Sequence, residues 1–113
     1  MSEIYEENGI IESMFFCTEK GLTHRTWIDF ARGSCCFAGY ELTGDMCFIW
    51  ITSLMHILEV DTLDDETVIG KVVRVRHEGI GGRIRAIGHP IKEIWMDPET
   101  LFAAAREKRE LSE

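Results

Sequence analysis

The chain has 113 residues, of which 45% are apolar, and its 20 acidic and 12 basic side chains give a formal net charge of −8. A chain of this length can bury one core without disulfides, so we expect a single domain. The acidity argues against nonspecific binding to DNA, and the lack of a run of about 18 uncharged apolar residues argues against a membrane protein. Four cysteines without metal-site or disulfide-scaffold spacing predict reduced thiols and a cytoplasmic location.

The first half of the chain is predicted to form a three-stranded meander. Residues 1–9 are polar, with several acids, and are expected to be flexible. The segments that follow are rich in β-branched and aromatic side chains and are separated by turn signals. They predict strands over residues 10–18, 24–31 and 35–42.

Alternation in the second of these strands assigns its two faces. Ile28 and Phe30 fall on one face. The opposite face carries Arg25, Trp27 and Asp29. In the third strand, Gly39 predicts a bulge or a point where another group approaches the backbone closely.

A helix is predicted over residues 46–60, with Asp45 as its N-cap. Apolar side chains extend beyond one stripe of this helix, so it must be covered on most sides. Either the sheet and the last helix cover it, or a second copy of the protein does, which would make a homodimer or a higher homo-oligomer. The candidate self-association residues, which lie outside the apolar stripe, are Phe48, Ile51 and Met55.

Positive charge is concentrated between residues 70 and 96. Apolar and basic residues alternate there, which predicts an antiparallel hairpin with its loop at residues 77–82. In the simplest register the arginines lie in two facing pairs, Arg74 with Arg85 and Arg76 with Arg83. The other face then pairs Val73 with Ala86 and Val75 with Ile84.

This arginine hairpin has two interpretations. Four guanidiniums on one surface can hold phosphates or carboxylates through paired donors. Alternatively, they form a solvated strand face that is balanced by acids such as Asp64, Asp65 and Glu66. A Gly-His-Pro sequence within the second strand predicts a bend that re-aims His89. The candidate anion- or partner-binding residues are Lys71, Arg74, Arg76, Arg83, Arg85 and His89.

Cysteines and histidines are the usual zinc ligands and nucleophile or base residues, but their spacing here matches no motif for either role. We therefore expect no metal, no cofactor and no enzymatic activity. Catalysis is the third alternative, and it requires the fold to bring a thiol and an imidazole together. The residues concerned are Cys17, Cys35, Cys36 and Cys47 with His24, His56, His77 and His89.

The last helix is predicted to begin at Pro98, with Asp97 as its N-cap, and residues 107–113 are expected to form a polar tail. The whole pattern predicts a single α+β domain over residues 10–106. It contains about five antiparallel strands and two helices, in the order β-β-β-α-β-β-α, with the apolar helix crossing the sheet.

Four stretches resemble a family of small phage and prophage proteins: FAGYEL at residues 37–42, ILEV at 57–60, GKVVRV at 70–75 and AIGHPIKEIWMDP at 86–98. That family has a GGY-type strand, a helix ending in a VVGV-like turn, a G-K-x-x-R-V strand and an A-I-G-H-x-I-K-D-x-W-F-D-P segment. This chain has Ala38, Glu93 and Met96 where the family has glycine, aspartate and an aromatic residue. The resemblance implies a mobile-element accessory protein in the cytoplasm of a bacterial host.

The expected function is therefore a non-enzymatic inhibitor, similar to anti-CRISPR proteins, that binds a host defence protein or complex. It would bind through its acidic surface or through the arginine hairpin. The alternative is an oligomeric sponge that sequesters a nucleotide immune signal, with an aromatic side chain on the base. Its phosphate-binding residues would be Arg74, Arg76, Arg83 and Arg85.

Overall fold

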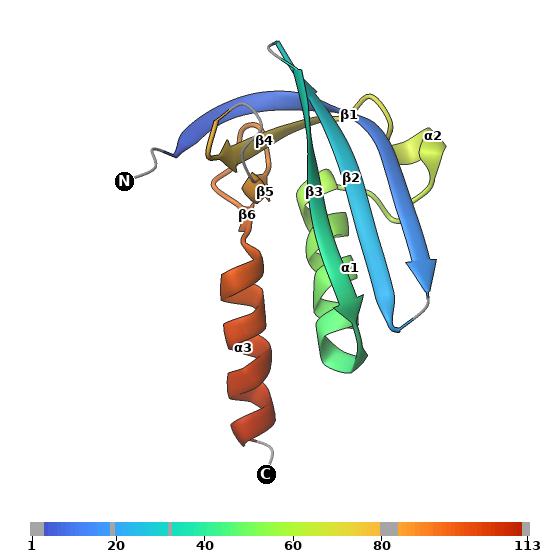
Figure 1. Cartoon of the computed structure of the whole chain (residues 1–113), viewed down its shortest axis with the longest axis vertical. Helices are drawn as coiled ribbons and strands as arrows, with labels where there is room; N and C mark the ends of the chain where they lie inside the picture. The colour runs from blue at the N-terminus through green and yellow to red at the C-terminus, as the bar shows by residue number, and fades with distance from the viewer. Residues whose placement is uncertain (1–3, 19, 32, 80–83, 112–113) are drawn as a thin grey trace.

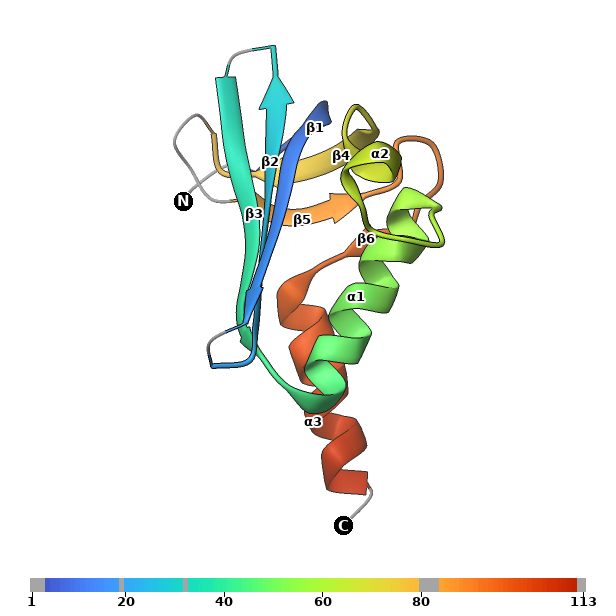
Figure 2. The same cartoon turned by 90° about the vertical axis from the view of Figure 1, so that its right-hand side faces the viewer.

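The computed structural model describes residues 4–18, 20–31, 33–79 and 84–111. These residues form an α+β fold in which an antiparallel sheet curls around the helices (Figures 1 and 2). The sheet has six strands among the described residues, in the order β3-β2-β1-β4-β5-β6. The elements are β1 (Tyr5–Thr18), β2 (Leu22–Phe30), β3 (Gly33–Leu42), α1 (Gly44–Leu58), α2 (Asp65–Val68), β4 (Val72–His77), β5 (Ile84–Gly88), β6 (Trp95–Met96) and α3 (Pro98–Leu111).

The predicted class is confirmed, but the predicted strand number and element order are wrong. The short helix α2 stands between α1 and β4, and the two-residue strand β6 stands between β5 and α3. Elements this short give no periodic signal in a sequence. Two strand residues or a single helical turn end before the pattern of apolar residues can repeat.

Strand β1 is much longer than the sequence predicted. Residues 5–9, which were assigned to a flexible terminus, pair with β4, beginning with Tyr5 opposite His77. The second half of the same strand pairs with β2, from Ile10 opposite Asp29 onward. The two halves of the sheet are thus joined through one strand. At the other end of the chain, α3 runs to Leu111 and so includes residues 107–111 of the predicted tail.

Helix α1 begins at Gly44, and Thr43 occupies its N-cap position without a side-chain capping bond. The prediction of Asp45 as N-cap is therefore wrong, and Asp45 lies in the first turn instead. The helix ends at Leu58, because Glu59 takes a left-handed conformation with φ of 55°. None of the helices in the described ranges has both the length and the apolar character needed to cross a membrane.

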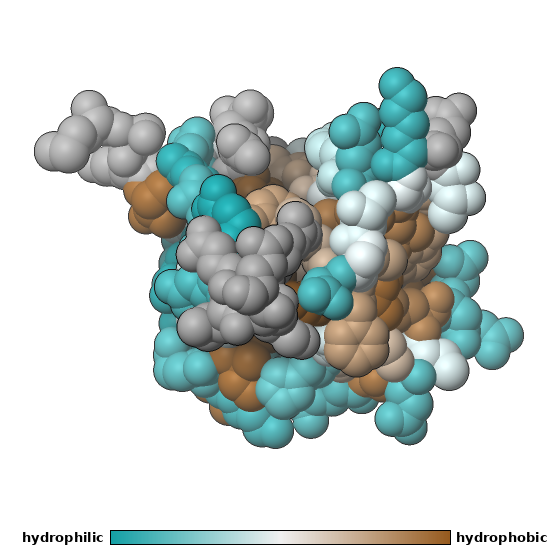
Figure 3. Space-filling model, turned by 90° about the horizontal axis from the view of Figure 1, so that it is seen from below, coloured by the Kyte–Doolittle hydropathy of each residue, from teal (hydrophilic) through white to brown (hydrophobic). Residues whose placement is uncertain are grey.

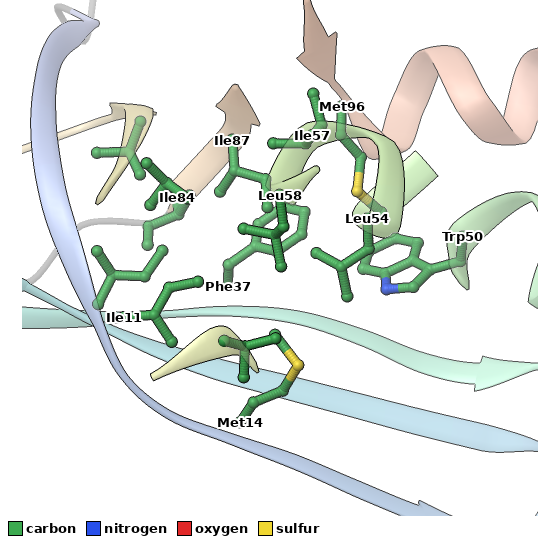
Figure 4. Close-up of a cluster of buried hydrophobic side chains, with 14 of the residues drawn as sticks. Ile11, Met14, Phe37, Trp50, Leu54, Ile57, Leu58, Ile84, Ile87 and Met96 are labelled. Carbon is green, nitrogen blue, oxygen red and sulfur yellow. The ribbon is translucent and has the colours of Figure 1, made fainter. Parts of the chain in front are cut away.

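The core lies between the inner face of the sheet and the helices, and Trp50 of α1 is fully buried in it (Figure 4). The Trp50 ring stacks on Phe37, with the ring centroids 5.3 Å apart, and on Phe102 at 6.1 Å. Its Nε1 donates a hydrogen bond to Nδ1 of His24 at 3.0 Å. The same core cluster contains the apolar residues Ile11, Met14, Leu54, Ile57, Leu58, Ile84, Ile87 and Met96.

The predicted close approach at Gly39 is confirmed. A Cβ atom at this position would lie 2.7 Å from the Trp50 ring. Contacts this short are not tolerated, and the ring is packed on both faces, so strand β3 or Trp50 would have to move. Glycine at position 39 is thus required for the core to close.

Replacing Gly39 by alanine is expected to lower the free energy of unfolding by about 1–3 kcal/mol through overpacking. Ser34→Ala is the matched control, because Ser34 is exposed on the same strand, and its effect should stay within about 0.5 kcal/mol. Urea denaturation followed by circular dichroism measures both changes. Equal stability of the two variants would show that the core yields to the extra methyl group.

Candidate functional site

The arginine hairpin does not have the predicted register. Arg74 lies opposite Gly88, and Arg76 lies opposite Ala86. On the inner face, Val75 lies opposite Ile87. The register then shifts between Arg76 and His77, so that His77 lies opposite Ile84. The predicted facing pairs Arg74–Arg85, Val73–Ala86 and Val75–Ile84 are therefore wrong. Arg83 lies outside the described residues.

Trp95 of β6 accounts for this register. Its ring lies under the two guanidiniums, with Cζ of Arg76 at 3.8 Å and Cζ of Arg74 at 5.1 Å from the ring centroid. A Cβ atom on Gly88 would come within 2.8 Å of the same ring, so only a residue without a side chain fits there. Two arginines therefore face small residues and an aromatic ring, which avoids the cost of opposed like charges.

Carboxylates from distant parts of the chain neutralise these arginines. Arg74 donates from Nη2 to Glu6 of β1 and from Nη1 to Glu93 at 2.8 Å. Arg76 donates from Nε to Glu6 at 3.3 Å. The hydrogen bond from Arg74 lowers the pKa of Glu6 and that of Glu93, and these bonds raise the pKa of Arg74. Two guanidiniums and two carboxylates thus form a locally balanced cluster.

Arg85 is balanced in the same way. Its Nε donates to Glu78 at 2.6 Å, and its Nη1 lies 3.5 Å from a carboxylate oxygen of Glu99 at the start of α3. Lys71 lies just before β4, where its carbonyl accepts a hydrogen bond from the Ile11 N–H at 2.9 Å. A phosphate bound to Arg74, Arg76 or Arg85 would have to displace Glu6, Glu93 or Glu78. The acids named in the sequence analysis, Asp64, Asp65 and Glu66, do not pair with these arginines.

His89 lies in the predicted bend, where the chain leaves β5 at Gly88. Its Nδ1 accepts hydrogen bonds from the backbone N–H groups of Ile91 and Lys92, each at 3.0 Å. The ring proton is therefore on Nε2, which donates to the carboxylate of Glu59. Both ring nitrogens are occupied, so His89 has no free lone pair for proton abstraction. It fastens the end of α1 to the loop after β5.

In His77 and His24, too, both ring nitrogens have a hydrogen-bond partner. His77 accepts from the Gly79 N–H at 3.0 Å through Nδ1, and its Nε2 lies 2.7 Å from the Glu7 carboxylate. The Nδ1 of His24 accepts from Trp50, so its Nε2 proton is directed at the Thr26 hydroxyl at 2.5 Å. Burial lowers the pKa of His24 to about 4. These side chains act as internal connectors.

Nucleophilic catalysis by a thiol requires a base such as an imidazole within hydrogen-bond reach. Among the described residues, none of the hydrogen bonds joins a cysteine to a histidine, and the thiol of Cys36 points to the Phe37 carbonyl at 3.9 Å. Burial raises the pKa of the Cys36 thiol, which lowers its thiolate fraction. No group of three or more cysteine, histidine or acidic side chains in the described ranges is arranged to hold a metal ion.

The candidate self-association residues of α1 divide into two groups. Phe48 is 70% exposed, whereas Ile51 and Met55 are half-buried. Helix α1 has apolar side chains on several sides, and the sheet and α3 cover most of them. Seen from below, brown and tan apolar surface still reaches the exterior between polar residues (Figure 3).

The acids that the sequence assigned to balancing the arginines belong instead to a separate acidic ridge, which consists of Asp61, Asp64, Asp65 and Glu66. All four side chains are exposed, and none forms an ion pair with another described residue. A composition count along the chain reveals these acids, but only the structure separates them from the acids that neutralise the arginines. The ridge lies on and before α2, which projects at the edge of the fold beside β1 (Figure 1).

The ridge is held rigidly. The Asp64 carboxylate accepts hydrogen bonds from the Thr62 hydroxyl and the Thr67 N–H, both at 3.0 Å, and the bond from Thr62 lowers its pKa. Val68 is buried, and the next turn is tied to β1 by the bond from the Gly70 N–H to the Ile11 carbonyl at 2.9 Å. The carboxylates are thus presented on an ordered turn. Comparison with protein-family models, curated proteins and solved structures finds no match to this chain.

Proposed function

We propose that this protein is a non-enzymatic binding protein that inhibits a host defence component by occupying a basic, nucleic-acid-binding surface with its acidic ridge. The single observation that carries the proposal is the division of the carboxylates. The carboxylates beside the hairpin are paired with arginines. The four carboxylates of the acidic ridge are exposed and form no ion pair with the described residues. Unpaired charge of one sign on a surface favours a partner of the opposite sign.

The physical basis is the preorganisation of the ridge. The capping box at Asp64 and the buried Val68 fix the turn before any partner arrives. A rigid array loses little conformational freedom on binding, so more of its electrostatic attraction appears as affinity. The resemblance to small phage proteins supports a counter-defence role, and a CRISPR effector is a suitable target because its nucleic-acid channel is lined with positive charge.

The hairpin arginines are the weaker candidate for contact with the partner. Arg74, Arg76 and Arg85 already hold carboxylates, so a new anion gains only the difference between two similar interactions. The same argument disfavours nucleotide sequestration at this face. The ridge needs no such exchange.

The test is inhibition of nucleic-acid binding by purified CRISPR effector complexes, titrated with this protein at several salt concentrations. We expect inhibition near equimolar ratio that weakens as salt rises, because exposed charges are screened. The Asp65→Lys/Glu66→Lys variant should inhibit about 10–100-fold more weakly. Its matched control, Glu41→Lys/Glu107→Lys, makes the same change in net charge away from the ridge and should inhibit like the natural protein.

Three outcomes would contradict the proposal. Equal inhibition by both double variants would exclude the ridge as the binding surface. Inhibition that needs only catalytic amounts of the protein would indicate turnover. A rise in melting temperature with a cyclic or NAD-derived nucleotide, abolished by Arg74→Ala, would instead support nucleotide sequestration.

A further inference from the structure

The outer face of the meander is the surface of β1, β2 and β3 that points away from α1. Figure 1 looks onto this face, with α1 behind the strands, and in Figure 2 no described helix covers it. The pairing of the strands shows which residues lie side by side across this face. Trp27 lies between Ser13 and Cys36, and Arg25 lies between Phe15 and Ala38.

Aromatic side chains dominate this outer face. One comes from each strand, and the exposed fractions are 58% for Phe15, 39% for Trp27 and 59% for Tyr40. A shallow hollow of about 280 Å³ lies among five side chains, Phe15, Cys17, Thr23, Arg25 and Trp27. Large apolar side chains gathered on one exposed face indicate an interaction surface.

The charges of the outer face are divided between its two ends. Along β2 the outward residues are Asp29, Trp27 and Arg25 in that order. Arg25 forms no ion pair with the described residues, and its Cζ lies 5.6 Å from the Tyr40 ring centroid. At the other end, a hydrogen bond with Asp29 raises the pKa of Glu12, so two carboxyl groups stand together without a cation.

We propose that the outer face binds a second copy of this chain, related by a two-fold axis that crosses β2 at Trp27. The axis runs between the outer faces of the two copies, parallel to both sheets and perpendicular to the strands. The strands of the second copy therefore run opposite to those of the first. Each Arg25 then faces the Asp29 end of the other copy, and the two Trp27 side chains meet at the axis. The unpaired cation and the unpaired carboxyls of one face thus complement those of an identical face.

The spacing along the strands agrees with this arrangement. Arg25 and Asp29 are each two residues from Trp27, about 6.7 Å along the strand in opposite directions. The same rotation places Phe15 over Ile10 of the other copy, and Ile10 is 50% exposed in the single chain. Two sheets that pack face to face lie about 10 Å apart, a gap that arginine, tryptophan and phenylalanine side chains can fill.

Other occupants fit the outer face less well. Sheet faces with exposed aromatic residues also bind single-stranded nucleic acid, but such sites track the phosphates with several basic residues. Here one arginine stands against two carboxyls, in a protein with a net charge of −8. A different protein would not need a cation and an anion placed symmetrically about one tryptophan.

Analytical ultracentrifugation of charge-reversed variants tests the proposal. Arg25→Glu places like charges opposite one another twice per dimer, and so does Asp29→Arg. Each variant alone is expected to raise the dimer dissociation constant by about 100-fold. An equimolar mixture of the two should form a heterodimer within about 10-fold of the natural affinity, because both facing pairs are then opposite in sign.

Controls separate this interface from other causes. Arg106→Glu changes an exposed charge on α3 and should leave the dimer intact. Unchanged circular dichroism melting curves show that the Arg25 and Asp29 variants fold. A natural protein that stays monomeric at millimolar concentration, or a mixture that stays monomeric, overturns the proposal. So does dissociation by Phe48→Glu but not by Arg25→Glu, because the interface would then lie on α1.

Discussion

Replacing Trp50 by alanine is expected to lower the free energy of unfolding by about 4–8 kcal/mol. The substitution leaves a cavity between Phe37 and Phe102, which contributes about 3–5 kcal/mol, and it removes the donor for the buried Nδ1 of His24, which contributes about 1–3 kcal/mol more. A domain of this size is stable by only about 5–15 kcal/mol, so much of the population should unfold. Urea denaturation monitored by circular dichroism measures the loss.

Trp50→Phe separates the two contributions. Phenylalanine keeps most of the stacking on Phe37 but cannot donate to His24, so its expected cost is about 1–3 kcal/mol. A Trp50→Phe variant as unstable as Trp50→Ala would mean that the hydrogen bond, rather than the filled volume, holds the core. A Trp50→Ala variant with natural stability would contradict the described core altogether.

The free energy of unfolding is expected to fall by about 3 kcal/mol as the pH drops from 6.5 to 4, through His24 alone. Burial lowers the pKa of His24 from its ordinary 6.5 to about 4, so the unfolded chain binds this proton at a higher pH than the folded chain does. The stability is therefore complete above pH 6.5 and is lost as the pH falls toward 4. Protonated His24 also cannot accept the bond from Trp50.

His24→Asn is the control for this acid sensitivity. Its amide oxygen can accept from Trp50 Nε1, and the amide does not titrate. The variant is expected to show a flatter dependence of stability on pH between 6.5 and 4.5. Glu6 and Glu93, whose pKa values are lowered by Arg74, are present in both proteins and contribute equally to the two curves. Parallel curves for the two proteins, measured by urea denaturation at each pH, would contradict the assignment to His24.

Local alternation predicted the meander well. It placed Arg25, Trp27 and Asp29 on one face of β2, and the structure confirms this. The same alternation puts His24 on the inner face, so its buried position could have been found from the sequence. Its partner could not, because Trp50 lies on a helix 26 residues away.

The hairpin and its partners could not be predicted from local pattern. Glu6 belongs to a segment whose composition resembles a flexible tail, yet it pairs with Arg74 across 68 positions of sequence. The register depends on Trp95, which needs a glycine beneath its ring at position 88. Neither contact leaves a periodic signal, so sequence reasoning placed the arginines opposite one another and named the wrong balancing acids.

Strand β1 belongs to both halves of the sheet, which sets an order on chain synthesis. Its second half can pair with β2 once the meander has left the ribosome, but Tyr5 has no partner until His77 has been made. Closing so long a loop late carries a large entropic cost and slows completion of the sheet. Until then the first half of β1 is an open edge that carries Glu6 and Glu7, and charged side chains on an edge strand disfavour pairing with another chain.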